Sequence, residues 1–237
     1  MSELTLRLNE RFYGDQEHPY KTYENTILRL LPSNAAVLDV GCGHTAPVIG
    51  KLAHHCRLAL GADVTNFDPE KAHSDVCLMS TDLHAVCLKG RSLDMVISRS
   101  VLEHIKDPET MFREVCRILK PGGHFIFLTP NLYDYASIIS KLIPNRFHSA
   151  IVKATEGRDE EDTFPTFYRA NTAKDITRLA SASDFHVKEI SLLGQYPAYL
   201  MFNPFFYLIG AAYDRIVCSF DALAFLRGWI LCVLVKE

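Results

Sequence analysis

The sequence predicts an α/β fold built on a doubly wound, mostly parallel sheet of seven strands whose last strand runs antiparallel. Three observations predict this fold. Short apolar runs alternate with amphipathic segments, a pattern typical of a parallel sheet with helices on both faces. A glycine-rich turn separates the first apolar run from the first amphipathic segment. The last two runs are joined by a long connection, which suits an antiparallel pair at the edge of a mixed sheet.

Seven apolar runs are predicted to be strands. In chain order they are 36–40, 57–63, 75–79, 93–98, 124–129, 186–193 and 228–235. Helices are predicted over 45–54, 108–119 and 172–183. The helix over 108–119 has its apolar residues at helical spacing, and the segment 120–123, Lys-Pro-Gly-Gly, is predicted to end it.

Composition restricts the partners and the compartment. The net charge is −3 and no run of Lys or Arg is longer than two, which argues against nucleic acid as the main partner. The seven cysteines form no C-x-x-C pair, and residues 1–10 contain no apolar signal region, so a reducing, cytoplasmic location is expected. The segment 196–213 is free of charge, but Pro197 and Pro204 interrupt it. We therefore expect a cap or interfacial element there rather than a membrane span.

The segment 37–45, Val-Leu-Asp-Val-Gly-Cys-Gly-His-Thr, carries the clearest motif. Gly41 and Gly43 allow a tight turn and a close approach of backbone to ligand. The third glycine of a dinucleotide fingerprint is missing, since Thr45 and Ala46 stand where it would lie. Asp39, just before the glycines, would repel a pyrophosphate and attract an ammonium or sulfonium group.

Two further carboxylates follow the next two strands. Asp63 ends the second strand, where an acidic side chain can accept two ribose hydroxyls. Asp82 follows the third strand, where a carboxylate could accept from an exocyclic adenine amine. Each aspartate alone could simply cap a helix. Together with Asp39 they indicate an adenosine ligand that carries an amino-acid tail.

The chain resembles the class I S-adenosylmethionine-dependent methyltransferases, in particular the branch of ubiquinone and natural-product methyltransferases. The sequence VLDVGCG at 37–43 resembles their first motif, and residues 92–123 resemble their fourth-strand to fifth-strand region. The resemblance is strong over about 35–130, weak over 170–237 and absent from two inserted segments. It departs from the family at Thr45, where many members have glycine. It implies a Rossmann-like fold with S-adenosyl-L-methionine as the cofactor.

The resemblance also implies a division of one domain, 1–237. Residues 1–34 would form N-terminal cap helices, 35–130 the cofactor-binding core, and 131–170 and 196–227 two insertions on the substrate side. Gly41 and Gly43 would lie against the methionine portion, Leu83 beside the adenine, and Ser98 and Arg99 near the transferring end. The other expected cofactor-binding residues are Cys42, Val64, Thr81 and, from the N-terminal segment, Tyr20.

Catalytic and substrate residues are less constrained, because the cofactor is already activated and the protein mainly aligns the reactants. His104, after the fourth strand, is the candidate base, although it could instead cap the loop. Tyr133, Tyr168 and Arg169 are candidates for the substrate pocket, with a hydrophobic lid anchor as the alternative. No metal is expected, because the adjacent residues of the run 54–56, His-His-Cys, cannot face one ion.

The expected function is methyl transfer to a small or lipid-linked acceptor, with O-methylation ahead of N- or C-methylation. One alternative is a partner or sensor protein that binds the cofactor without transfer, and another is an NAD-dependent dehydrogenase. The aromatic segment 196–213 is expected to line the pocket, to contact a second copy in a homodimer or to touch a membrane surface.

Overall fold

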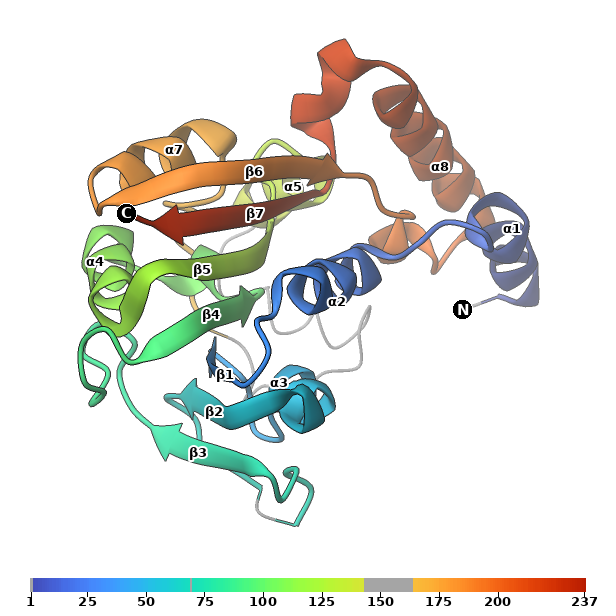
Figure 1. The fold of residues 1–237 in the computed structure, drawn as a ribbon. Helices are drawn as coiled ribbons and strands as arrows, with labels where there is room; N and C mark the ends of the chain where they lie inside the picture. The colour runs from blue at the N-terminus through green and yellow to red at the C-terminus, as the bar shows by residue number, and fades with distance from the viewer. Residues whose placement is uncertain (1, 69, 143–163) are drawn as a thin grey trace.

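The computed structural model describes residues 2–68, 70–142 and 164–237. These residues form a seven-stranded sheet with the strand order β3-β2-β1-β4-β5-β7-β6 (Figure 1). The strands are β1 (Ala35–Val40), β2 (Cys56–Asp63), β3 (Val76–Ser80), β4 (Leu93–Arg99), β5 (Leu119–Pro130), β6 (Phe185–Leu193) and β7 (Trp229–Lys236). Only β7 is reversed, since it pairs antiparallel with both β5 and β6. The predicted fold class is therefore confirmed.

The helices predicted over 45–54, 108–119, 172–183 and in the N-terminal segment are present with different ends, and two further helices lie within the expected insertions 131–170 and 196–227. They are α1 (Glu3–Tyr13), α2 (Pro19–Leu30), α3 (Pro47–Leu52), α4 (Pro108–Ile118), α5 (Tyr135–Leu142), α7 (Ala173–Ser181) and α8 (Pro204–Ser219). Short 3₁₀ helices are η1 (Ala53–His55), η2 (Leu102–His104), η4 (Ala198–Leu200) and η5 (Asp221–Leu226). Helix α3 begins at Pro47 rather than at 45 because Ala46 has a left-handed conformation. Strand β5 begins at Leu119, which pairs with Leu93.

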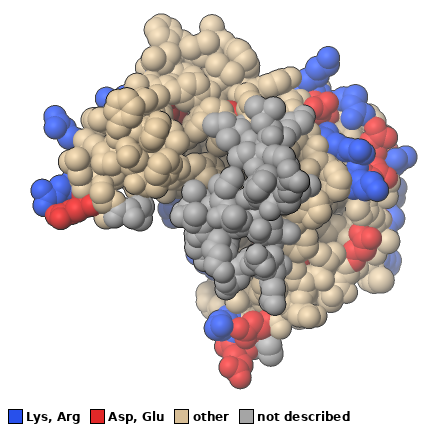
Figure 2. Space-filling view, turned by 180° about the vertical axis from the view of Figure 1, so that it is seen from behind, with Lys and Arg blue, Asp and Glu red and all other residues tan. Residues whose placement is uncertain are grey.

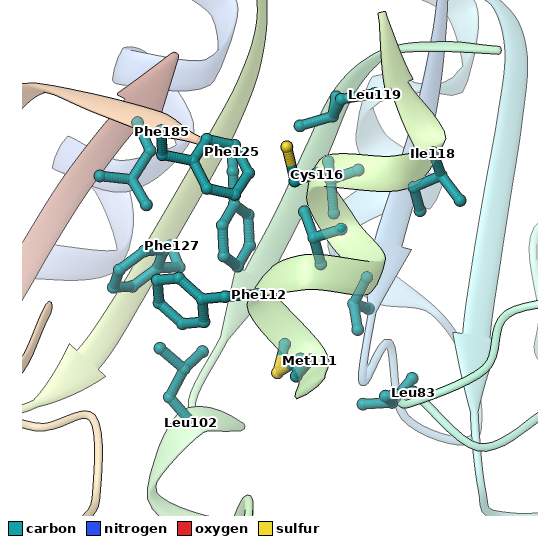
Figure 3. Packing of buried hydrophobic residues seen from close by; sticks show 14 of the residues in the cluster. Leu83, Leu102, Met111, Phe112, Cys116, Ile118, Leu119, Phe125, Phe127 and Phe185 are labelled. Carbon is teal, nitrogen blue, oxygen red and sulfur yellow. The ribbon is translucent and has the colours of Figure 1, made fainter. Parts of the chain in front are cut away.

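Two hydrophobic layers cover the sheet, and the alternation of residues along each strand decides which layer a side chain joins. Leu38 and Val96 point to the face covered by α4 and α7, whereas Val37 and Ile97 point to the face covered by α2 and α3. Phe112 of α4 lies at the centre of the first layer, with ring centroids 5.6–6.4 Å from those of three other phenylalanines (Figure 3): Phe125, Phe127 and Phe185.

Helix α1 lies away from the sheet, where it packs against α8, whereas the C-terminus lies at the end of β7 in the sheet (Figure 1). The Tyr13 hydroxyl donates to the buried carboxylate of Asp214 over 3.0 Å, and the Tyr207 hydroxyl donates to Asn9. Pro204 does not break α8 but begins it, because proline is tolerated in the first helical turn. None of the helices in the described ranges has both the length and the apolar character needed to span a bilayer.

Candidate functional site

The glycine-rich turn after β1 is shaped by left-handed backbone. Gly41 and Gly43 have φ values of 72° and 73°. A Cβ on Gly41 would lie 2.2 Å from a methyl of Val101, so this position must stay small. A Cβ on Gly43 would meet nothing within 4 Å, so that side of the turn faces open space. Ala46, where a third glycine could stand, is also left-handed with φ 47° and is completely buried.

Asp39 lies at the end of β1 on the side of the sheet that α2 covers. It is only 2% exposed, and its Oδ2 atom has no hydrogen-bond partner in the described part of the chain. Burial raises the pKa of its carboxyl to about 7, while the Arg99 guanidinium opposes that rise. The hydroxyl of Tyr23, a fully buried residue of α2, likewise has no partner among the described residues. Buried polar atoms are rarely left unpaired, so this part of the site is suited to a cationic or hydrogen-bonding ligand group.

Asp63 at the end of β2 holds the glycine turn in place. Its Oδ2 atom accepts from the Gly43 amide over 2.7 Å, and its Oδ1 atom accepts from the Thr65 amide over 3.0 Å. Each carboxylate oxygen keeps a second lone pair, so the two oxygens can still accept from the two hydroxyls of a ribose. The sequence indicated only the ligand role, whereas the structure adds this role in shaping the turn.

Helix α2 brings an aromatic residue over the end of β4. The Arg99 guanidinium lies 4.3 Å from the ring centroid of Tyr20 and 4.0 Å from the carboxylate of Glu24. The Tyr20 ring also packs edge-on against Trp229 of β7, with 5.4 Å between centroids. The Ser98 hydroxyl is buried and donates to the carbonyl of Val40 over 3.0 Å. Ser98 therefore joins β4 to β1, and Arg99 and Tyr20 lie together at the site.

The residues expected around the adenine have varied surroundings. Asp82 is exposed, and its Oδ1 atom is 2.9 Å from the His84 amide and 2.6 Å from the His84 ring. Leu83 is 6% exposed and belongs to the core layer that contains Met111 (Figure 3). Val64 is exposed and follows Asp63 at the same edge of the sheet. Thr81 also lies at this edge, where its amide donates to the Asp63 carbonyl. Parallel strands place Asp39, Asp63 and Asp82 in order along that edge, but Asp82 is at its exposed end.

His104 is the last residue of η2, and Val101, which packs against Gly41 of the glycine turn, directly precedes that helix. The His104 Nδ1 atom lies 3.1 Å from the carbonyl of Pro165, so in the neutral ring this nitrogen donates to the carbonyl and Nε2 keeps a lone pair. Nε2 is 3.9 Å from the carboxylate of the buried Glu103. Burial raises the pKa of Glu103, and the nearby His104 opposes this.

Glu103 belongs to a buried chain of side chains that sequence reasoning missed. Thr129 of β5 donates to Glu103 over 3.3 Å, and the Asn171 amide donates to Thr129 over 2.7 Å. The backbone carbonyl of Glu103 accepts from the amide of Tyr168. Threonine and asparagine this far apart in the sequence give no periodic signal, so only the packing of β5 against the segment before α7 identifies them.

The three candidate substrate residues make separate contacts. Tyr133 is exposed, and its ring centroid lies 6.3 Å from that of Phe225. Tyr168 has a left-handed backbone with φ 51°. Arg169 donates to the carbonyl of Lys106 over 2.8 Å and lines a surface cavity of about 810 Å³ that also includes Arg178. Residues 143–163 of the expected insertion lie outside the described residues.

Known proteins are similar to this chain in sequence and in fold. The chain is 35% identical over 148 residues to a ubiquinone biosynthesis O-methyltransferase of Xanthomonas axonopodis, covering 53% of this chain and 59% of that protein. This chain spans little more than half the length of several such curated relatives. The YcgJ protein of Bacillus subtilis superposes with a TM-score of 0.57 at 15% identity, covering 92% of this chain and 99% of that one.

The fold alone does not identify a reaction. The [4+2]-cyclase SpnF has it too, with a TM-score of 0.56 at 16% identity over 91% of this chain and 80% of that one. A family description, "Methyltransferase domain", matches residues 16–190, which include the glycine turn, the strand-end aspartates and His104. This match covers most of the sequence, so the chain belongs to the methyltransferase domain family.

Proposed function

We propose that this protein binds S-adenosylmethionine and transfers its methyl group to a small acceptor. The observation that carries this proposal is the buried Oδ2 atom of Asp39, which has no partner among the described residues, at the end of the strand that leads into the glycine turn, where Gly43 is open. An ammonium group there would pair with the carboxylate, and the bare backbone at Gly43 would let the ligand approach closely. Asp63 would then accept from the ribose hydroxyls and Asp82 from the adenine amine.

The bound cofactor would supply an activated methyl group on a sulfonium. The S–CH₃ bond breaks as the bond from the acceptor to the methyl forms, and the acceptor's proton must leave. The protein's part is alignment, exclusion of water and, for a hydroxyl acceptor, removal of that proton. In this proposal His104 takes the proton on Nε2, and the resulting imidazolium lies beside the Glu103 carboxylate.

Calorimetry with S-adenosylhomocysteine and with NAD tests the cofactor. Tight binding of S-adenosylhomocysteine without binding of NAD supports the proposal, and the reverse result establishes the dehydrogenase alternative instead. Asp63→Ala should weaken S-adenosylhomocysteine binding by about 1–3 kcal/mol through the loss of charge-assisted hydrogen bonds. Because Asp63 also holds the turn, a melting curve of the variant must accompany that measurement.

O-methylation is favoured because similar proteins are named ubiquinone biosynthesis O-methyltransferases and because His104 offers a free imidazole nitrogen. Incubation with labelled S-adenosylmethionine and matched phenol, amine and activated-methylene acceptors tests this point. Mass spectrometry of the product identifies the methylated atom. Retention of cofactor binding without transfer to any of these acceptors would favour the partner or sensor alternative.

A lipid-linked acceptor is favoured by the exposed face of α8. Phe205, Ile209 and Ile216 are 53–68% exposed there. Figure 2 shows a broad surface at the upper left of the view with almost no charged side chains, where α8 lies. Aromatic and aliphatic side chains on one face of a helix suit peripheral contact with a membrane surface.

All seven cysteines are free thiols, which fits the cytoplasmic location that we propose.

Flotation with phosphatidylcholine vesicles tests the membrane contact. Phe205→Ser with Ile209→Ser should abolish flotation, whereas Leu28→Ser, a matched change at an exposed leucine of α2, should not. Sedimentation velocity without lipid tests the homodimer alternative. A dimer that the α8 variant converts to a monomer would assign this face to a second copy.

A further inference from the structure

We propose that His54, His73 and Asp75 form a binding site for a divalent transition-metal ion of the zinc or cobalt class. Each of these residues offers one ligand atom, and the three atoms lie within 4.8 Å of one another. The site lies at the surface at the C-terminal end of α3. It shares no residue with the glycine turn or with Asp39, Asp63 and Asp82. The proposal does not depend on the reaction that the protein catalyses.

Two separate segments build the site. His54 belongs to η1, at the end of α3, and His73 and Asp75 belong to the connection between β2 and β3. The His73 side chain packs on Gly50, where an added Cβ would lie 3.2 Å from the Cβ of His73. A larger residue at position 50 would force His73 to shift by a few tenths of an ångström, so the glycine of α3 leaves room for His73 at its present place.

The distances suit closure around an ion. The two imidazole rings are edge-on with 5.3 Å between centroids. The Asp75 carboxylate lies 3.8 Å from the nearer nitrogen of His54 and 3.9 Å from that of His73. Ligand atoms around a tetrahedral zinc ion are about 3.3 Å apart, given bond lengths of about 2.0–2.1 Å. His73 Nδ1 accepts from the Asp75 amide over 3.3 Å, so small rotations of these partly exposed side chains that also exchange this hydrogen bond for the ion would bring the ligands to coordination distance.

The ligand set selects the kind of ion. Two imidazoles and one carboxylate favour zinc, cobalt, nickel or copper over magnesium and calcium, which prefer oxygen ligands alone. Three protein ligands leave a fourth position for water. The sequence predicted no metal here because the adjacent residues 54–56 cannot all face one ion. The tertiary structure instead supplies His73 and Asp75, which follow His54 by about twenty residues.

An ion at this position would connect the end of α3 to the β2–β3 connection. That connection also contacts the glycine turn, since the amide of Asp68 donates to the carbonyl of His44 over 3.0 Å. A bound ion should therefore stabilise the fold around the turn, because a ligand that binds only the folded state raises the melting temperature.

The test is titration of the full chain with Co²⁺ under reducing conditions, followed by absorption spectroscopy and competition with Zn²⁺. One ion per chain is expected, with a spectrum of nitrogen and oxygen ligands and a higher melting temperature. His54→Gln and His73→Gln should each weaken binding at least about tenfold, and Asp75→Asn should weaken it as well. His55→Gln, a change at the adjacent exposed histidine, is the control and should leave the affinity unchanged.

Three results would overturn the proposal. The first is the absence of saturable binding to the wild-type chain. The second is an unchanged affinity in both His54→Gln and His73→Gln, which would place the ion elsewhere. The third is a thiolate-to-cobalt charge-transfer band, because exposed thiols such as Cys77 and Cys87 would then be the ligands. Circular dichroism of each variant shows whether the fold is retained.

Discussion

The titration of Asp39 gives the sharpest test of the cofactor site. The ammonium of S-adenosylhomocysteine should pair with the ionised carboxylate, whereas the carboxyl of the free protein has a pKa of about 7. Binding below that pH must therefore release a proton from Asp39. The affinity is expected to fall as the pH is lowered, because a growing share of the free protein carries a neutral carboxyl at this position.

The size of this effect follows from the pKa. With a pKa of about 7, roughly three quarters of the carboxyls are ionised at about pH 7.5 and roughly 3% at about pH 5.5. The dissociation constant should therefore rise about 25-fold over this range, which corresponds to about 1.9 kcal/mol. A carboxyl with an ordinary pKa would be ionised throughout and would leave the affinity almost constant.

Isothermal titration calorimetry in buffers of different ionisation enthalpy measures both the affinity and the protons released. Asp39→Asn should bind more weakly at pH 7.5 and should lose the pH dependence. His18→Gln is the control at a second ionisable group, since the His18 ring packs edge-on against Tyr20 and burial lowers the pKa of His18 from its ordinary value. A wild-type affinity that stays constant from pH 5.5 to 7.5, or an unchanged slope in Asp39→Asn, would refute the reasoning.

Three further predictions concern the same site. Asp39→Asn should raise the melting temperature at pH 8. The pKa of Asp39 is about 7 in the folded protein and 3.8 in the unfolded chain, so the protonated carboxyl favours the folded state at low pH. That contribution to the free energy of unfolding, about 4 kcal/mol at most, is lost as the pH rises through about 7. Gly43→Ala should lose cofactor binding and lower the melting temperature by a few degrees, because a φ of 73° strains an alanine although its Cβ meets nothing. Gly41→Ala adds a clash with Val101 to the same strain, so it should melt at a much lower temperature and be partly rescued by Val101→Ala. Equal melting temperatures for the two glycine variants would contradict the contact geometry. His104→Gln should reduce turnover of a hydroxyl acceptor about 10²–10⁴-fold in a labelled-methyl assay while leaving S-adenosylhomocysteine binding intact, and unchanged turnover would exclude the base role.

Much of this protein can be predicted from local patterns. Short, continuous apolar runs identify the parallel strands because both faces of the sheet are covered, so that successive residues such as Val37 and Leu38 of β1 are buried in opposite layers. The glycines of the turn and the aspartates at the strand ends are likewise visible, because parallel strands deliver their carboxyl ends to one edge. The family resemblance rests on these same residues, and the match over 16–190 confirms it.

The sequence by itself therefore determined the fold class and the family, and it predicted the edge of the sheet at which the cofactor would bind. Only the tertiary structure decided which distant residues complete each site: Tyr23 beside Asp39, Thr129 and Asn171 behind Glu103, and His73 with Asp75 beside His54. The physical reason is that local periodicity fixes the direction of a side chain on its own helix or strand. The partner it meets depends on how α2, β5 and the β2–β3 connection pack across the sheet, and no short-range pattern encodes that packing.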